Sequence, residues 1–287
     1  MRRLPDRSHE SIGDLAPLTL SQAASGIRRG LFTAEQLTAH YLERIRQHDS
    51  RIHAWAFLDA SRALDEARKA DDVVRSGAPL GPLHGIPIAV KDIIYTKGIP
   101  TRMGSPIFAG FVPEHSAACV EKLTLAGAFV QGKTVTTEFA NQHPGPTANP
   151  WNSAFTPGGS SSGSAAAVAA GFTAAALGSQ TRGSVIRPAV YCGVVGYKPS
   201  FGLISRFGVH PVSPTLDHVG VLARSVDDAG LLTSCLMGHD PRDASSLADA
   251  QTPADLLDLG DLDDPPRLAA VRSPLWGTAD NAQQQLF

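Results

Sequence analysis

Apolar residues recur at two spacings along this chain, one typical of helices and one typical of buried strands. Leu37, Tyr41 and Ile45 follow one another at intervals of four and so share one face of a helix. This stretch begins with the capping box Thr33-Ala34-Glu35-Gln36. Further on, Ile86–Val90 is a short apolar run bounded by Gly and Pro. The pattern therefore predicts an amphipathic helix and, after it, a short buried strand that ends in a lysine.

Further helical and strand-like segments alternate along the rest of the chain. Helices and strands joined by short links are typical of α/β proteins with a mainly parallel sheet. We therefore predict an α/β architecture whose catalytic loops lie at strand ends. The segments behind this prediction are a helix over Ala60–Arg75 that stops at Gly77, a helix over Ser116–Leu125 that ends at Gly127, a strand over Ala128–Gln131 with a turn at Gly132, an alanine-rich helix from Ala165 to Gly171, a strand over Arg267–Val271 and a helix that begins at Thr278.

Composition and charge narrow the class of protein. The 287 residues are 43% hydrophobic, which is enough for one large domain or two small ones. We expect a loose arm over residues 1–16 and a domain over residues 17–287. The net charge of -2 comes without a basic stripe or a block of like charge. Nucleic acid and an anionic membrane are therefore disfavoured as principal partners, and a small molecule is favoured.

Cysteine usage and the absence of long apolar runs indicate the compartment. Cys119, Cys192 and Cys235 are odd in number, widely spaced and form no C-x-x-C pair, so they support neither a disulfide framework nor a zinc site. The first residues lack the apolar core of a signal peptide, and no apolar run approaches the ~20 residues needed to span a bilayer. We therefore expect a cytoplasmic protein.

A phosphate-binding formula occurs in an unsuitable context. Gly127–Thr134 fits G-x-x-x-x-G-K-[ST], the loop that follows a strand and precedes a helix. Here a predicted helix comes before the formula, and its middle is strand-like. We interpret the segment as the end of a strand that carries a lysine.

A run of serines and glycines, Thr156–Ser164, marks a candidate site for acyl transfer. It lies immediately before the alanine-rich helix, where hydroxyls and unpaired backbone N–H groups gather at one spot. Within it, Gly159–Gly163 fits the nucleophile elbow G-x-S-x-G with Ser161 as nucleophile, a motif that needs a strand directly before it and a later Asp and His. The later pair Asp217-His218 is adjacent in sequence. Anion binding at the helix N-terminus without catalysis is a further alternative.

A third pattern joins three separated residues. Lys91 closes the buried strand, Ser160 lies in the serine-glycine run, and Ser184 lies in the segment Gln180–Pro188. Together these segments resemble the amidase signature family, and the resemblance extends from about residue 18 to 280. It is supported by Leu83–Asp92, Gly132-Lys133-Thr134, Glu138-Phe139-Ala140, Asn149-Pro150-Trp151 and Cys192–Pro199.

The resemblance implies a fold and a reaction. The fold would be a mixed, mainly parallel central sheet flanked by helices on both faces, incomplete at the C-terminus. The reaction would be hydrolysis of a carboxylic amide to an acid and ammonia or an amine, through an acyl-enzyme and without metal or cofactor. By motif position, Ser184 is the nucleophile, Ser160 a bridging serine after a cis peptide bond, and Lys91 the base.

The implied roles make demands on the residues. Lys91 must be neutral near pH 7, and burial would lower its pKa from ~10.4. The alternative for Lys91 is a salt bridge at the strand end, for instance with Asp92. The oxyanion of the reaction would be held by backbone N–H groups in the loop before Ser184. The residues of that loop are Gln180, Thr181, Arg182 and Gly183.

Two arginines near Ser184 bear on substrate choice. Arg182 stands where the family usually has glycine. It could narrow the pocket, attract a substrate that carries a carboxylate, or spoil the oxyanion hole. Arg187 follows three residues after Ser184 and could bind an acidic group of the substrate through two parallel hydrogen bonds. The alternative for Arg187 is a structural ion pair.

The resemblance leaves other functions open. Relatives include A subunits of amidotransferases that act on glutamyl-tRNA or aspartyl-tRNA, which supply ammonia from glutamine within a complex with B and C subunits. Another alternative is an inactive remnant that only binds ligands or partners, since family members usually continue well beyond this point. A homodimer is a further expectation for partners.

Overall fold

The computed structural model describes residues 18–248 and, beyond them, residues 265, 267, 269, 271, 272, 274 and 276–286. The chain divides into two compact units, Met1–Leu257 and Asp258–Phe287. The expected arm over residues 1–16 lies outside the described residues, and the domain over residues 17–287 stays a prediction. No helix in the described ranges is both long and apolar enough to cross a membrane.

A single mixed sheet of six strands organises the first unit, in the order β1-β3-β2-β4-β6-β5. Parallel pairing is confined to the centre, where β2 lies between β3 and β4, and the other three pairings are antiparallel. The mixed sheet is confirmed, but "mainly parallel" describes only its centre. Parallel neighbours need a crossover connection, and α4 and α5 occur in those between β2, β3 and β4. The strands are β1 (Trp55–Leu58), β2 (Pro87–Lys91), β3 (Phe129–Thr134), β4 (Ala175–Gln180), β5 (Val195–Tyr197) and β6 (His218–Ala223).

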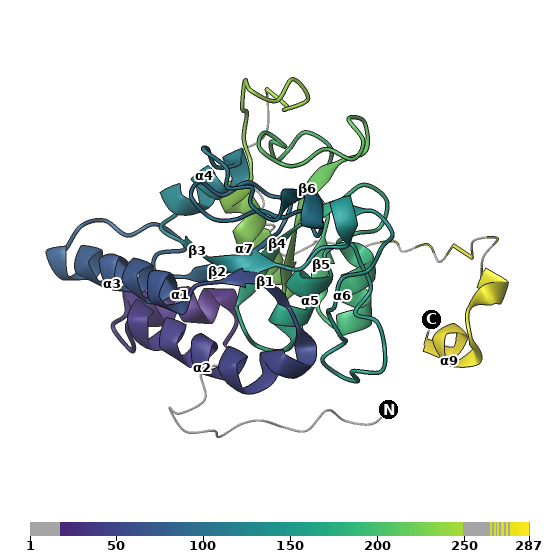
Figure 1. Ribbon diagram of the computed structural model, residues 1–287, viewed down its shortest axis with the longest axis horizontal. Helices are drawn as coiled ribbons and strands as arrows, with labels where there is room; N and C mark the ends of the chain where they lie inside the picture. The colour runs from purple at the N-terminus through teal and green to yellow at the C-terminus, as the bar shows by residue number, and fades with distance from the viewer. Residues whose placement is uncertain are drawn as a thin grey trace. The chain divides into compact units, whose positions relative to one another are not determined.

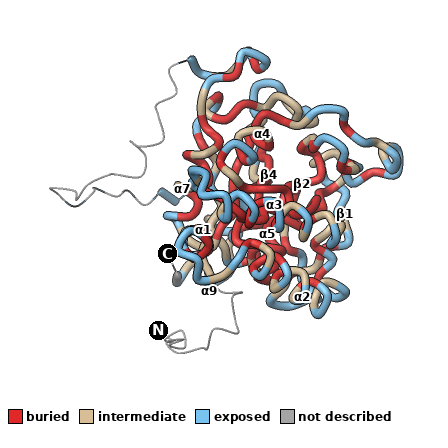
Figure 2. Tube along the Cα trace, turned by 90° about the vertical axis from the view of Figure 1, so that its left-hand side faces the viewer, coloured by how far each residue is buried: buried red, intermediate tan, exposed pale blue. Residues whose placement is uncertain are grey.

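Helices cover both faces of this sheet, as expected. In β2, Ile88 and Val90 pack into a cluster with residues of α1, α4 and α7, while Ala89 packs with residues of α5 and α6. Figure 1 shows α5 and α6 side by side, and Figure 2 shows that β2 and β4 are buried along their length. The helices within residues 18–248 are α1 (Leu20–Arg28), α2 (Ala34–Ile52), α3 (Ala60–Ser76), α4 (Ala118–Leu125), α5 (Ser162–Ala169), α6 (Ile186–Cys192) and α7 (Val226–Leu236).

Local sequence signals set several of these boundaries. At the start of α2, Thr33 Oγ1 accepts a hydrogen bond from Gln36 N at 3.0 Å, and Gln36 Oε1 accepts one from Thr33 N at 2.9 Å. The predicted capping box is therefore confirmed. Helix α3 ends at Gly77, whose φ of 72° is the left-handed conformation that glycine adopts without strain. Helix α4 begins at Ala118, two residues later than expected.

The expected turn at Gly132 is wrong, because β3 continues through this residue to Thr134. A Cβ at position 132 would lie 2.7 Å from the Phe57 carbonyl oxygen and 2.9 Å from the Trp55 ring. Glycine is thus needed here for close approach of β1 rather than for a change of direction. The phosphate-loop formula therefore ends inside a strand, which confirms its interpretation as a strand that carries a lysine.

The second unit contains the 3-10 turn Trp276–Thr278 and α9 (Asn281–Leu286). Asp280 Oδ1 accepts a hydrogen bond from Gln283 N at 2.8 Å, as at a helix N-cap. The helix expected from Thr278 onward is present, starting three residues later. The strand expected over Arg267–Val271 is not found at residues 267, 269 and 271, which are those of the segment that the structure describes.

Gly163 offers a test of the packing between α5 and the sheet. A Cβ at this position would lie 2.3 Å from the Ala54 carbonyl oxygen and 2.4 Å from the Val135 nitrogen, which are backbone atoms that cannot rotate away. Although Gly to Ala normally stabilises a helix by ~1 kcal/mol, we expect Gly163→Ala to destabilise the protein by about 1–3 kcal/mol or more. Urea unfolding measures the change.

The matched control is Gly110→Ala, because a Cβ at Gly110 meets no atom within 4 Å and its φ is not positive. We expect this variant to unfold like the wild type. Equal stability of both variants would contradict the close packing of α5.

Candidate active site

Lys91 lies at the carboxyl end of the central strand β2, and its side chain is fully buried. Its Nζ donates hydrogen bonds to Ser160 Oγ at 2.7 Å and to Ser179 Oγ at 2.8 Å. Burial lowers the pKa of Lys91 to about 7, and the charge of Asp217 acts in the opposite direction. The amine therefore exchanges between neutral and charged forms near neutral pH.

The alternative of a salt bridge between Lys91 and Asp92 is not what the structure shows. Asp92 Oδ1 lies 3.8 Å from Lys133 Nζ, and Lys133 also donates to the Ile94 carbonyl oxygen at 2.6 Å. Burial raises the pKa of Asp92 to about 6. The Lys91 amine instead lies beside two serine hydroxyls. Hydroxyl groups can exchange protons with an amine.

Three backbone contacts fix the segment around Ser160. Arg187 Nε and Nη2 donate to the Gly159 carbonyl oxygen at 2.9 and 2.7 Å. The Ser160 carbonyl oxygen accepts from Thr137 N at 3.2 Å, and Ser161 N donates to the Ser184 carbonyl oxygen at 3.1 Å. The peptide bond between Gly159 and Ser160 is cis. The loop that carries Ser160 is therefore anchored to α6 and to the segment after β3.

Ser161 occupies a structural position. Its buried hydroxyl donates to the Ser179 carbonyl oxygen at 3.2 Å and accepts from Ser179 N at 3.3 Å. No strand directly precedes it, because residues 153–160 form turns, bends and irregular backbone. His218 Nδ1 lies 2.7 Å from the Leu216 carbonyl oxygen. The context that a nucleophile elbow requires is therefore absent around Ser161 in the described residues.

Ser184 lies beside a cavity of about 670 Å³ that Gly159, Thr181, Gly183 and Arg187 also line. No hydrogen bond joins Ser184 Oγ to Ser160 Oγ among the described residues, and catalytic hydrogen bonds are often long before a substrate binds. The structure thus brings Lys91 and Ser160 into direct contact. The backbone hydrogen bond from Ser161 N to the Ser184 carbonyl oxygen places Ser184 next to the loop that carries Ser160.

The loop before Ser184 has free backbone donors. Among the described residues, no protein acceptor bonds the N–H groups of Thr181, Arg182 or Gly183. Gln180 differs, since it is the last residue of β4, and its side-chain Oε1 accepts from Val185 N at 2.8 Å and Ile186 N at 3.0 Å. The side-chain amide of Gln180 thus accepts hydrogen bonds from backbone N–H groups at the start of α6. The N–H groups of the loop remain available to donate to another acceptor.

In the part of the chain that the structure describes, Arg187 forms no ion pair, which was the alternative considered for it. Two of its nitrogens instead bond the Gly159 carbonyl oxygen. Arg182 is exposed and lines the same cavity. Substrate binding by Arg187 stays a prediction, and its observed contact is with the loop of Ser160.

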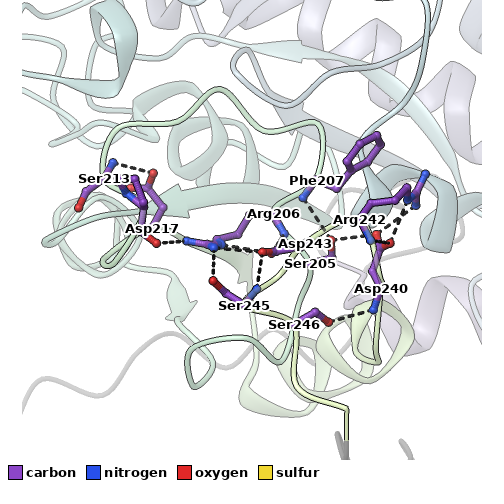
Figure 3. Close-up of polar contacts among 11 residues, drawn as sticks. Ser205, Arg206, Phe207, Ser213, Asp217, Asp240, Arg242, Asp243, Ser245 and Ser246 are labelled. Atoms are coloured by element: carbon purple, nitrogen blue, oxygen red, sulfur yellow. Dashed lines mark hydrogen bonds and ion pairs between the residues drawn. The ribbon is translucent and has the colours of Figure 1, made fainter.

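Sequence reasoning did not indicate Ser179 in this site, and it considered Asp217 only as the acid of a nucleophile elbow. Asp217 Oδ1 accepts from Thr181 Oγ1 at 2.6 Å, and its Oδ2 accepts from Val212 N and Ser213 N at 2.8 Å each. Figure 3 shows Asp217 beside Ser213. Arg206 donates to the Pro214 carbonyl oxygen in the same loop and to Asp243 Oδ1, and so joins this loop to the segment of Asp243. The sequence could have indicated Ser179, because this residue lies near the end of an apolar run that can pair, as a strand, with the strand of Lys91.

Comparisons with known proteins agree with this geometry. The model of the family described as Amidase matches residues 36–287. The chain belongs to the amidase family. The A subunit of glutamyl-tRNA(Gln) amidotransferase from Cyanothece sp. is 47% identical over 221 residues, which cover 75% of this chain and 46% of that protein. The chain spans about half the length of the curated relatives that it matches.

Solved amidase structures share the fold. The peptide amidase from Stenotrophomonas maltophilia is 36% identical, with a TM-score of 0.77, over 82% of this chain and 50% of that chain. The A subunit of glutamyl-tRNA(Gln) amidotransferase from Thermotoga maritima is 35% identical, with a TM-score of 0.69, over the same two shares, 82% and 50%. The sheet and helices of the first unit are therefore those of an amidase.

Replacing Lys91 with Met tests the buried amine through stability. Because the folded pKa is about 7 and an unfolded lysine titrates near ~10.4, Lys91 makes the wild type progressively less stable as the pH falls between these values. We expect Lys91→Met to gain stability relative to the wild type over that interval, with the full difference below about pH 7. Urea unfolding of both proteins at several pH values from about 7 to 10 measures this. A difference that stays constant across the interval would show that Lys91 is not neutral when buried.

Proposed function

We propose that the protein hydrolyses a carboxylic amide to an acid and ammonia or an amine, with Ser184 as nucleophile, Ser160 as proton relay and Lys91 as base. The observation that carries this proposal is the buried contact of 2.7 Å between Lys91 Nζ and Ser160 Oγ, next to a cavity lined by Ser184. A lysine with a pKa of about 7 can accept a proton at neutral pH. Serine needs such a base to attack an amide carbonyl.

The proposed reaction has two halves. As Ser184 Oγ bonds to the amide carbon, its proton passes to Ser160 and the proton of Ser160 passes to Lys91. The free N–H groups of Thr181, Arg182 and Gly183 support stabilisation of the oxyanion that forms. The relay then returns a proton to the departing nitrogen, which leaves as ammonia or an amine. Water attacks the ester on Ser184, and the acid is released.

Supply of ammonia to a larger enzyme is a second candidate function. It is favoured by the relatives at 44–47% identity, which are named as the A subunits of amidotransferases. The same chemistry on glutamine would then serve a complex with B and C subunits. Copurification with such subunits would favour this role, whereas turnover of small amides by the chain alone would favour a stand-alone amidase. Both roles fit a cytoplasmic location.

Serine replacements test the assigned roles. We expect Ser184→Ala to abolish labelling by a fluorophosphonate probe, because the probe bonds to an activated serine. Ser160→Ala should slow labelling by ~10²–10⁴-fold, the range of general acid–base catalysis. Mass spectrometry of the labelled peptide identifies the modified residue.

Ser161→Ala serves as the neighbouring control and should still be labelled at Ser184. Labelling at Ser161 in the wild type would favour the nucleophile elbow instead. A folded but unlabelled wild type would support the inactive remnant.

The pH dependence of labelling tests the base. Since Lys91 has a pKa of about 7 and acts in its neutral form, the labelling rate should rise with pH up to about 7 and level off above it. The charge of Asp217 raises the pKa of Lys91. Asp217→Asn should therefore move the midpoint to lower pH. Because Asp217 also holds Thr181, the midpoint rather than the maximal rate is the relevant readout, and an unmoved midpoint would contradict Lys91 as the titrating base.

A further inference from the structure

The cavity beside Ser184 has an unbalanced positive charge. Of the described residues that line it, only Arg182 and Arg187 carry charged side chains, and neither aspartate nor glutamate is among them. Asn141, Gln142 and Thr156 add polar groups without charge. A pocket with cations and no acid lowers the energy of an anionic ligand relative to a neutral one.

The two arginines differ in how far their hydrogen-bonding groups are already used. Arg187 directs two nitrogens at the Gly159 carbonyl oxygen. The side chain of Arg182 has no hydrogen-bond or ion-pair partner in the described part of the chain, and it is exposed at the cavity. Arg182 is therefore the cation that is available to a ligand.

The acid close to this loop, Asp217, forms no ion pair with Arg182 in the described part of the chain. Asp217 is bound to the neighbouring Thr181, and both of its oxygens accept hydrogen bonds. Its carboxylate is thereby committed to Thr181, Val212 and Ser213. The positive charge of Arg182 remains unpaired next to the space that a substrate would occupy.

The loop accommodates an arginine at position 182 without strain. Its φ is not in the left-handed region, which contains only His53, Met103, Phe139 and Ala140 among the described residues other than glycine. The N–H groups of Thr181, Arg182 and Gly183 remain without a protein acceptor in this part of the chain. Of the three consequences considered for Arg182, a spoiled oxyanion hole is therefore the one that the backbone does not support.

We propose that Arg182 selects amides that carry a carboxylate at the end away from the scissile bond, such as monoamides of short dicarboxylic acids. This inference rests on the proposed function and specifies its substrate class. A guanidinium can bond both oxygens of a carboxylate, which gives such a pair both strength and orientation. Arg182 acts as a specificity residue, distinct from the groups that move protons.

The experiment compares two substrates of nearly equal shape, succinamate and succinamide, which differ in a carboxylate and a second amide. The wild type should prefer succinamate by about 10- to 100-fold in kcat/KM, as expected for a charge-assisted pair. Arg182→Gln should remove this preference mainly through a higher KM for succinamate. Arg29→Gln removes an equal charge from an exposed position at the end of α1 and should keep the preference.

Other outcomes separate the inference from the proposed function. Equal use of both amides by the wild type, or a preference that survives in Arg182→Gln, would overturn the inference while amidase activity stands. Faster turnover of both amides by Arg182→Gly to the same degree would also overturn it, because Arg182 would then only obstruct the cavity.

A binding measurement tests the anion site if the protein does not hydrolyse amides. If Ser184 is neither labelled nor active, the proposed function fails, and calorimetric titration with succinate tests the anion site alone. Binding that is at least tenfold weaker in Arg182→Gln than in Arg29→Gln supports the site. Absent binding, or equal binding by the two variants, overturns it.

Discussion

The burial of one lysine amine is the constraint on which the site depends. A charged ammonium inside a protein is costly, so a buried lysine either meets a counter-ion or loses its proton near neutral pH. Lys91 is at the end of a strand with neighbours on both sides, and its nitrogen contacts the hydroxyls of Ser160 and Ser179. The sheet therefore supplies both the dry surroundings and the hydroxyl partners that keep this amine reactive.

The sheet also explains how distant segments meet. Strands β2 and β4 are parallel neighbours, with Val90 opposite Leu177, so their carboxyl ends reach the same edge. Lys91 ends one strand, and the loop to Ser184 follows the other. Helix α5 begins at this edge, with Ser160 just before its first turn, and β4 then brings the chain back to the same edge. The contact between Lys91 and Ser160, which are far apart in sequence, thus follows from the order of three neighbouring strands.

Local signals made much of this predictable. Three elements follow from local backbone preferences that agree with the fold. They are the helix start capped by Thr33, the helix end at Gly77 and the apolar strand that ends in Lys91. Gly132 was misjudged because its role depends on Trp55, a residue of another strand. Sequence reasoning could not predict the partner of Arg187 either, because that partner is a backbone carbonyl, which every residue has.

The family resemblance paired Lys91 with Ser160, and the structure places these two side chains in contact. The resemblance did not indicate Ser179, whose contact with Lys91 depends on strand register. It also did not indicate Asp217, which contacts Thr181 from a loop later in the chain.

Two links tie the serine-glycine loop to the start of α6, and they have a mechanical consequence. One joins Ser161 N to the carbonyl oxygen of Ser184, and the other joins Arg187, about one helical turn later, to Gly159. Ser160 and Ser184 are therefore parts of one closed ring of covalent and hydrogen bonds. Because the ring joins the two backbones, we expect thermal motion to move them together, so the loops around the cavity can flex while the spacing between the two serine backbones changes little.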